Sequence, residues 1–321
     1  MRRLLPLSCV ALLSLACAGA ALAGNGGLAP PSPASPQASD IRDIYWLILG
    51  ISIGIFLLVE VTLAVFIVRY RSRGRAREVE GPQIRGHTNL ELAWTAGPVV
   101  ILAVIAGFVF WKAASIKNAP AGIPRDTIGI EAHQFYWEFT YPNGAHSVNI
   151  LRVPYRRQIK LVIASADVAH SWWAPSLAGK MDAIPGRVNR LSFRALKLGT
   201  FPARCAEFCG LQHTQMLAQV EVLPPDQYEE FVRQRLDQPG ALARETFSGV
   251  CAKCHGLAGQ GDIGPPIATS GLLSDSAAMT LLLRQGRGKM PPVGKTWDDT
   301  QLRATIAYLQ KRFHAGGGSG S

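Results

Sequence analysis

The sequence predicts a multidomain membrane protein with three folded parts: a two-helix transmembrane hairpin, an all-β domain and an all-α domain. Two long apolar runs come first, an alternating β-type pattern follows, and helical patterns joined by short Gly/Pro loops end the chain. The composition agrees, because 48% of the 321 residues are hydrophobic and 17% are charged. Soluble proteins carry about 25% charged residues, so this composition disfavours a disordered or purely soluble chain.

The amino terminus has the pattern of a signal peptide over residues 1–23. Two arginines are followed by an apolar stretch and by a small-x-small cleavage site that ends at Ala23. The alternative is a lipoprotein signal that ends at Cys9 or Cys17. Residues 24–40 are rich in Gly, Pro, Ser and Ala, and we expect them to form a flexible arm on the exported side of the membrane.

Residues 41–112 are predicted to form the transmembrane hairpin. At about 1.5 Å per residue, residues 44–68 and 92–111 are each long and apolar enough to cross about 30 Å of hydrocarbon. Five arginines lie between these two runs: Arg69, Arg71, Arg73, Arg75 and Arg77. Basic loops stay in the cytoplasm, so we expect both termini on the periplasmic side of a bacterial inner membrane.

The net charge of +11 has a second explanation, which is a nucleic-acid-binding patch. A short basic loop between two membrane spans accounts for the arginine cluster better. We therefore expect membrane lipid, and no nucleic acid, among the partners of this chain.

Residues 113–223 are predicted to form the β domain. β-branched and aromatic residues alternate in four runs that Pro, Gly and Asn interrupt: Thr127–Tyr141, Gln158–Ser165, Arg190–Ala195 and Leu217–Val222. This pattern indicates a β-sandwich or barrel. Residues 224–240 are expected to form a linker helix, residues 241–315 an all-α domain, and residues 316–321 a flexible tail.

A set of soft metal ligands lies near the end of the β domain. Two cysteines, a glutamate, a histidine and a methionine follow one another closely: Cys205, Glu207, Cys209, His213 and Met216. His170, in the loop after a predicted strand, supplies a second imidazole. Thiolate and thioether ligands select copper or zinc, and structural zinc sites do not use methionine. The set therefore favours an electron-transfer site in which two cysteines bridge two copper ions; a Cys205–Cys209 disulfide is the alternative.

This motif resembles the binuclear copper A loop of cytochrome c oxidase subunit II. Segments 167–172 and 182–187 resemble the first copper-ligand loop of the same family. Two amino-terminal spans before an exported β domain also match, so the resemblance covers about residues 40–223. It implies a cupredoxin-like Greek-key domain.

The resemblance also implies a role for each ligand. Six residues would hold the two copper ions: Cys205 and Cys209 as bridges, His170 and His213 as terminal ligands, and Met216 and the Glu207 carbonyl as weak axial ligands. The Glu207 side chain would reach a magnesium ion shared with subunit I.

An aromatic run in the β domain resembles the family's site of electron arrival. In the family, the first tryptophan of this run lies where a mobile cytochrome c delivers its electron. Phe135 stands at that position here, which fits a tethered donor that uses another route. Phe135 and Trp137 are the candidate residues for electron arrival, and a core position is the alternative for Trp137.

Two carboxylates lie in or directly before the predicted membrane spans. Glu91 corresponds to a family glutamate at the mouth of a proton-conducting channel into subunit I. Its alternative is a helix-start carboxylate that the helix dipole favours. Glu60 lies within the first span, where an ionisable residue is a functional candidate by default; a buried hydrogen bond to a partner subunit is the simpler explanation.

The all-α domain contains a c-type haem attachment motif, Cys251-x-x-Cys254-His255. The cysteines would bond to the haem vinyl groups and His255 would bind the iron; a disulfide or thioredoxin-like site is the alternative. Met290, in a Gly/Pro loop, is the expected sixth ligand, while Met279 is expected in the core. A Met/His pair raises the haem potential.

Residues 241–313 as a whole resemble a class I cytochrome c, as in the variant of subunit II with a fused cytochrome c. This resemblance implies the electron-transfer subunit of a proton-pumping haem-copper terminal oxidase. Electrons would pass from haem c through the dicopper centre to subunit I, where oxygen is reduced.

The expected protein partners are subunits I and III and a reduced donor, either cytochrome c or quinol-cytochrome c reductase. Three alternatives stay open: the copper A subunit of a nitric oxide reductase, a quinol oxidase subunit, and a membrane-anchored redox sensor or copper carrier.

Overall fold

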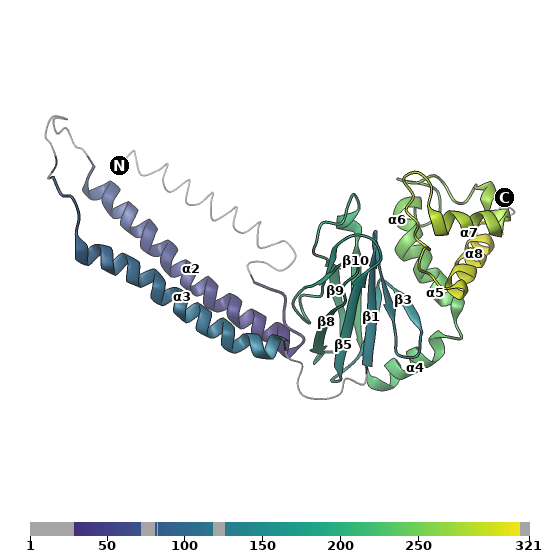
Figure 1. Ribbon diagram of the computed structural model, residues 1–321, viewed down its shortest axis with the longest axis horizontal. Helices are drawn as coiled ribbons and strands as arrows, with labels where there is room; N and C mark the ends of the chain where they lie inside the picture. Colours follow the sequence, from purple (N-terminus) through teal and green to yellow (C-terminus); the bar gives the residue numbers. More distant parts are fainter. Residues whose placement is uncertain (1–28, 72–80, 82, 118–125, 315–321) are drawn as a thin grey trace, which may run out of the picture. The chain divides into compact units, whose positions relative to one another are not determined.

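The computed structural model describes residues 29–71, 81, 83–117 and 126–314 of the chain (Figure 1). Several predicted features lie outside these described residues. They are the signal peptide, the first part of the predicted arm, the carboxy-terminal tail, and three arginines of the basic loop: Arg73, Arg75 and Arg77.

The amino-terminal hairpin consists of helices α2 (Pro36–Arg69) and α3 (Thr88–Lys117). Both are long and apolar enough to cross a membrane, which confirms the expectation of two apolar helices. Lys112 joins the end of α3 to the start of α2, because its Nζ lies 2.7 Å from Asp40 and 2.8 Å from Asp43. The two helices are therefore antiparallel neighbours.

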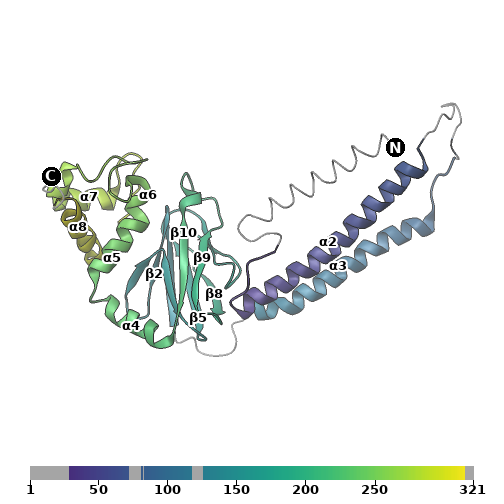
Figure 2. The same ribbon diagram turned by 180° about the vertical axis from the view of Figure 1, so that it is seen from behind.

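The β domain contains two five-stranded sheets, seen from opposite sides in Figures 1 and 2. The first has the order β3-β2-β1-β5-β8 and the second the order β4-β10-β9-β6-β7. Their bounds are β1 Asp126–His133, β2 Tyr136–Thr140, β3 His146–Val148, β4 Ile150–Pro154, β5 Gln158–Ser165, β6 His170–Trp173, β7 Met181–Ala183, β8 Asn189–Arg194, β9 Gly199–Cys205 and β10 Leu217–Leu223. Because β1 pairs with β5 and β4 with β10 in parallel, strands distant in sequence are neighbours.

Alternation along the strands builds the core between the sheets. In β5, Ile159, Leu161 and Ile163 are fully buried, and the residues between them are partly exposed. Trp172 of the second sheet packs edge-on against Trp137 of the first, with ring centroids 5.0 Å apart. Such aromatic pairs add about 0.5–1.5 kcal/mol beyond the burial of their surface. The predicted all-β domain is thus a two-sheet sandwich, as expected.

The prediction of a flexible arm over residues 24–40 is wrong for its last part. Ala34 is buried; its N–H donates to the Ser176 carbonyl and its carbonyl accepts from the Leu196 N–H, both at 2.7 Å. The Ser35 hydroxyl donates to the Leu177 carbonyl. Small side chains allow this close approach. The backbone hydrogen bonds offset the conformational entropy that this Gly/Pro/Ser-rich segment loses when it becomes ordered.

Helices form the carboxy-terminal domain. They are α4 (Pro225–Arg235), α5 (Pro239–Thr246), the π-helical turn η2 (Phe247–Cys251), α6 (Ala252–His255), the 3₁₀ turn η3 (Gly271–Ser274), α7 (Ser276–Gln285) and α8 (Asp299–His314). A further 3₁₀ turn, η1 (His213–Gln215), lies in the loop before β10. The helical linker segment is α4, while Pro239 begins α5, in keeping with the preference of proline for the first helical turn.

The helical domain and the first sheet share a core. Tyr136 and Val148 of the sheet lie in the same buried cluster as Phe247, Trp297 and Ile306 of the helical domain. The Tyr136 hydroxyl donates to the Val293 carbonyl at 2.8 Å and accepts from Trp297 Nε1 at 3.0 Å. One face of the first sheet is therefore covered by the second sheet, and part of the other by the helical domain.

Candidate metal centre and haem-attachment segment

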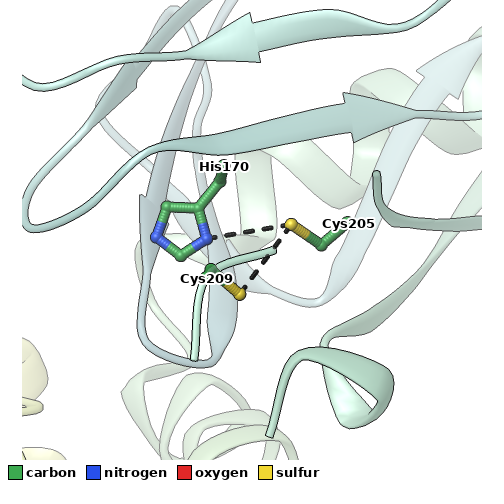
Figure 3. Close-up of side chains that lie close together, drawn as sticks. All are labelled: His170, Cys205 and Cys209. Atoms are coloured by element: carbon green, nitrogen blue, oxygen red, sulfur yellow. Dashed lines mark hydrogen bonds between the residues drawn. The ribbon is translucent and has the colours of Figure 1, made fainter. Parts of the chain in front are cut away.

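Two strands and one loop bring the predicted metal ligands together. His170 begins β6 and Cys205 ends β9, and these strands are paired. The loop from β9 to β10 then carries Cys209, His213 and Met216 back across the same end of the sheet. Figure 3 shows the side chains of His170, Cys205 and Cys209 pointing toward one another, and all three are buried.

The donor atoms of this cluster lie within hydrogen-bonding range of one another. The two cysteine Sγ atoms are 4.0 Å apart, and Cys209 Sγ is 3.5 Å from Nδ1 of His213. Nδ1 of His170 lies 3.8 Å from Cys205 Sγ and 3.2 Å from Met216 Sδ. The backbone carbonyl of Glu207 is 3.2 Å from Cys205 Sγ. All six predicted donors thus surround one small volume.

Both cysteines of the cluster are free thiols in this structure. A disulfide needs sulfurs about 2.05 Å apart, so the 4.0 Å separation disfavours the disulfide alternative. Burial alone would raise the pKa of Cys205, but hydrogen bonds from His170 and from backbone groups bring it below the ordinary value. Burial and the neighbouring Cys205 raise the pKa of Cys209. A cation bound between the two sulfurs would favour the thiolate form of both cysteines, which fits a metal at this cluster.

Asp167 orients the His170 ring. Its Oδ1 lies 2.8 Å from Nε2 of His170, which leaves Nδ1 facing the sulfur atoms. Burial opposes ionisation of Asp167, but the hydrogen bond with His170 and two backbone N–H groups keep its pKa below the ordinary value. Carboxylates in this position commonly fix the orientation of metal-binding histidines. Sequence reasoning missed the role of Asp167, although its spacing of three residues before His170 is a signal that could have found it.

The aromatic candidates occupy two different environments. Trp137 is fully buried, with its ring edge-on to His170 at a centroid distance of 6.0 Å. Phe135 is half-buried, and its backbone carbonyl accepts a 2.8 Å hydrogen bond from Lys253 Nζ of the helical domain. The neighbouring Gln134 donates to the Cys209 carbonyl at 2.6 Å. This strand end therefore touches both the metal cluster and the helical domain.

The haem-attachment segment has features that suit a bound haem. Cys251 and Cys254 are free thiols, and the structure holds no disulfide between them. The Nδ1 of His255 lies 2.6 Å from the Pro265 carbonyl, so its proton points there and Nε2 keeps a free lone pair. A Cβ at Gly264 would come within 2.8 Å of the His255 ring, so only glycine leaves the ring this space.

The two candidate methionines differ in burial. Met279 is buried in α7 within the helical core. Met290 is half-buried in the loop between α7 and α8, and its backbone pairs with Arg287 in both directions. A loop methionine at the edge of the core can still turn toward a ligand, whereas a core methionine is held by packing.

The membrane carboxylates are exposed in the described part of the chain. Glu91 lies in the first turn of α3, where its carboxylate accepts a 3.3 Å hydrogen bond from the His87 N–H. This contact is what the helix-start alternative predicts. Glu207 is also exposed, so its side chain is accessible to another subunit.

One contact joins the two candidate centres directly. Gln212, which precedes His213 in the loop from β9 to β10, donates from Nε2 to the Sγ of Cys254 at 3.0 Å. Gln212 is 9% exposed, so the contact is shielded from water. Sequence reasoning missed both Gln212 and Lys253, because no local pattern links positions so far apart in the chain.

Three family models match the chain. The model described as cytochrome c oxidase subunit II, transmembrane domain, matches residues 23–111, and the periplasmic domain of the same subunit matches residues 146–223. The model described as cytochrome c oxidase, cbb3-type, subunit III matches residues 238–309. Together they span the hairpin, the sandwich and the helical domain.

Individual relatives agree with these models. The chain is 30% identical over 335 residues to cytochrome c oxidase subunit 2 of Alkalihalophilus pseudofirmus, covering 96% of each chain. It is 29% identical over 260 residues to the same subunit of a Synechocystis species, covering 67% of this chain and 78% of the relative. The crystal structure of the periplasmic domain of subunit II from Bradyrhizobium japonicum is 27% identical, with a TM-score of 0.36, and covers 37% of this chain and 99% of that one.

Proposed function

The chain belongs to the cytochrome c oxidase subunit II family, and we propose that it relays electrons from its own haem c through a dicopper centre to the oxygen-reducing subunit I. As a member of this family it is a subunit of a haem-copper terminal oxidase, in complex with other oxidase subunits. Copper and haem c in general follow from the matched domains and from the buried Cys/His cluster. The relay itself is our proposal.

The observation that carries this proposal is the contact between the two centres. The Gln212 amide donates to Cys254 Sγ at 3.0 Å, and Gln212 is bonded along the chain to the copper-ligand candidate His213. Lys253 adds a second contact at Phe135. The haem-attachment segment thus rests on the copper loop of the same chain, where a separate donor protein would otherwise have to dock.

The residues proposed to hold copper are those whose donor atoms converge. Cys205 and Cys209 would supply the thiolates that hold two copper ions, His170 and His213 the imidazoles, and Met216 and the Glu207 carbonyl the weaker donors. A soft, largely buried donor set of this kind suits copper. When bound, the dicopper centre and the haem supply reversible one-electron chemistry. The exposed Glu207 carboxylate is proposed to reach a magnesium ion shared with subunit I.

The haem is proposed to be bound covalently through Cys251 and Cys254. His255 and Met290 would be its axial ligands. The hydrogen bond from His255 Nδ1 to the Pro265 carbonyl supports this, because it orients the free Nε2 as a ligand. A haem donor fixed within the chain has an effective concentration in the millimolar range, so transfer does not wait for a diffusional encounter.

The remaining roles follow from the same proposal. Phe135 and Trp137 would be candidates for electron arrival from the tethered haem domain and not a docking surface for a mobile carrier, because the helical domain contacts Phe135 and Trp137 is buried. Glu91 would take part in proton uptake toward subunit I. Both termini would lie on the periplasmic side of the membrane, where cytochrome c or quinol-cytochrome c reductase would supply electrons.

Metal analysis combined with electron paramagnetic resonance tests this function on the purified full chain. We expect two copper ions per haem and one unpaired electron shared by both copper nuclei. One copper ion, or zinc without the shared signal, would contradict the dicopper assignment. The chain would then be a membrane-bound cytochrome whose β domain has another task.

A further inference from the structure

A second cluster of ligating side chains lies on the face of the first sheet that the helical domain covers. Glu131 and His133 come from β1 and Glu138 from β2. Side chains two residues apart in a strand share a face, and Glu131 pairs directly with Glu138 across the ladder. The three side chains therefore project on the same side of the sheet.

The ligating atoms of this cluster converge. One atom of each of the three residues lies within 4.8 Å of the others. His133 Nε2 is 3.0 Å from Glu131 Oε2 and 3.9 Å from Glu138 Oε2. His133 is 7% exposed and Glu138 is 5% exposed, so both are almost removed from water.

Two buried atoms of the cluster make no hydrogen bond within the described part of the chain. They are Nε2 of His133 and Oε2 of Glu138. His133 Nε2 lies at ion-pair distance from Glu131 Oε2, 3.0 Å, so the imidazole nitrogen faces the carboxylates. A buried polar atom without a hydrogen bond costs about 1–3 kcal/mol, and here both atoms face the same small space.

Three carboxylates, Glu131, Glu138 and Asp298, face two imidazoles, His133 and His146, so a bound cation would bring the charge of this region closer to balance. Carboxylates directly opposite each other on neighbouring strands repel, and Glu131 and Glu138 have that arrangement. Asp298 of the helical domain adds a third carboxylate, 4.0 Å from His146. The Arg235 guanidinium nearby donates instead to the His146 backbone carbonyl and pairs with Glu245.

Surrounding residues hold the three side chains in place. His146 Nδ1 lies 2.9 Å from Glu138 Oε1, which leaves the other oxygen, Oε2, facing the cluster. The His133 ring stacks on Tyr136 at a centroid distance of 4.5 Å and an interplanar angle of 2°. Metal ligands typically have such an outer shell of positioning contacts.

We propose that Glu131, His133 and Glu138 bind a divalent transition-metal ion of the zinc type at the junction between the sheet and the helical domain. Imidazole with carboxylates suits Zn²⁺ better than Mg²⁺ or Ca²⁺, which prefer oxygen ligands alone. Three protein ligands leave a fourth position for water. The ion would neutralise the facing carboxylates and strengthen the contact of the helical domain with the sheet. This site is separate from the copper cluster and does not depend on the relay.

Zinc binding to the full chain tests the site. The background is the Cys205→Ser/Cys209→Ser double variant, in which the sulfur cluster cannot take up zinc. We expect one zinc ion to remain after dialysis, and we expect Glu138→Gln and His133→Gln each to weaken its binding at least about tenfold, since even outer-shell losses cost 10–100-fold. Glu229→Gln removes an exposed carboxylate of helix α4 and serves as the matched control, in which we expect unchanged zinc binding.

X-ray absorption at the zinc edge gives an independent measurement on the unmutated cluster in the same background. We expect nitrogen and oxygen ligands at about 2.0–2.1 Å. Sulfur ligands at about 2.3 Å, no retained zinc, or wild-type affinity in both cluster variants would overturn the proposal. The haem absorption spectrum of each variant reports whether its helical domain is folded, and the absorption edge decides the question if a variant does not fold.

Discussion

The two candidate redox centres of this chain are assembled in different ways. In the sandwich, two strands and one loop bring six donors into contact range, and most of them are buried. In the helical domain, His255 and Met290 lie on separate segments and share no hydrogen bond among the described residues. A metal ion is small, so the strands and loop of a β domain can hold its donor side chains in contact with one another. A haem is a large ring that would form part of the helical core itself, so the residues that would hold it need not contact one another.

Replacing one of the two cysteines proposed to bridge the copper ions should have the largest effect, because it should remove one centre and leave the other intact. We expect Cys209→Ser to abolish the shared-electron copper signal, because a serine hydroxyl cannot replace a thiolate between two copper ions. The haem absorption spectrum should not change. Leu211→Ser alters a fully exposed residue of the same loop and should keep the signal. A persistent copper signal in Cys209→Ser would remove the cysteine bridge from the proposal.

Removing the loop methionine tests the other centre. We expect Met290→Ala to leave the haem attached through its cysteines but to lower its reduction potential by on the order of 100 mV, since the thioether ligand raises the potential. A redox titration measures this. Met279→Ala is the matched control: loss of a core methionine should cost about 2–5 kcal/mol of stability and leave the potential unchanged. The opposite pattern would exchange the roles of the two methionines.

Weakening the outer shell of the copper cluster should have a smaller effect. We expect Asp167→Asn to lower copper affinity by about 10–100-fold, because the ring of His170 loses its charged partner. Competition with a copper chelator measures the change. Asp182→Asn is the control. It removes a carboxylate that accepts a hydrogen bond from Ser171, the neighbour of His170 in β6, and we expect this variant to have wild-type copper affinity. Equal losses of copper affinity in both variants would mean that the affinity depends on the negative charge near the cluster and not on the contact of Asp167 with His170.

The contact between the two centres should produce the smallest effect. We expect Gln212→Leu to lower the rate of haem-to-copper electron transfer by about fivefold, since a hydrogen bond of this kind contributes about 1 kcal/mol. Flash reduction of the haem, followed at the copper absorption band, measures the rate. The potentials of both centres should stay at their wild-type values. An unchanged rate would mean that the Gln212 contact does not position the two domains for transfer.

Local patterns carried most of what could be predicted. The apolar runs, the soft ligand set and the Cys-x-x-Cys-His motif each lie within a short stretch, so sequence alone indicated two spans, a metal-binding loop and a haem segment. The prediction of a flexible arm was partly wrong, because composition does not reveal that the backbone of Ala34 forms hydrogen bonds with Ser176 and Leu196. A Gly/Pro/Ser-rich segment is flexible only where no tertiary contact holds it.

The amino-acid sequence by itself determined which side chains are present for the chemistry and which parts of the chain are apolar enough for a membrane. The tertiary structure decided which atoms face each other. It turned Nδ1 of His170 toward the sulfurs, and it placed Gln212 against Cys254. It also gathered Glu131, His133 and Glu138 under the helical domain. Strand pairing and domain packing join residues far apart in the chain, and no local pattern of residues records such contacts.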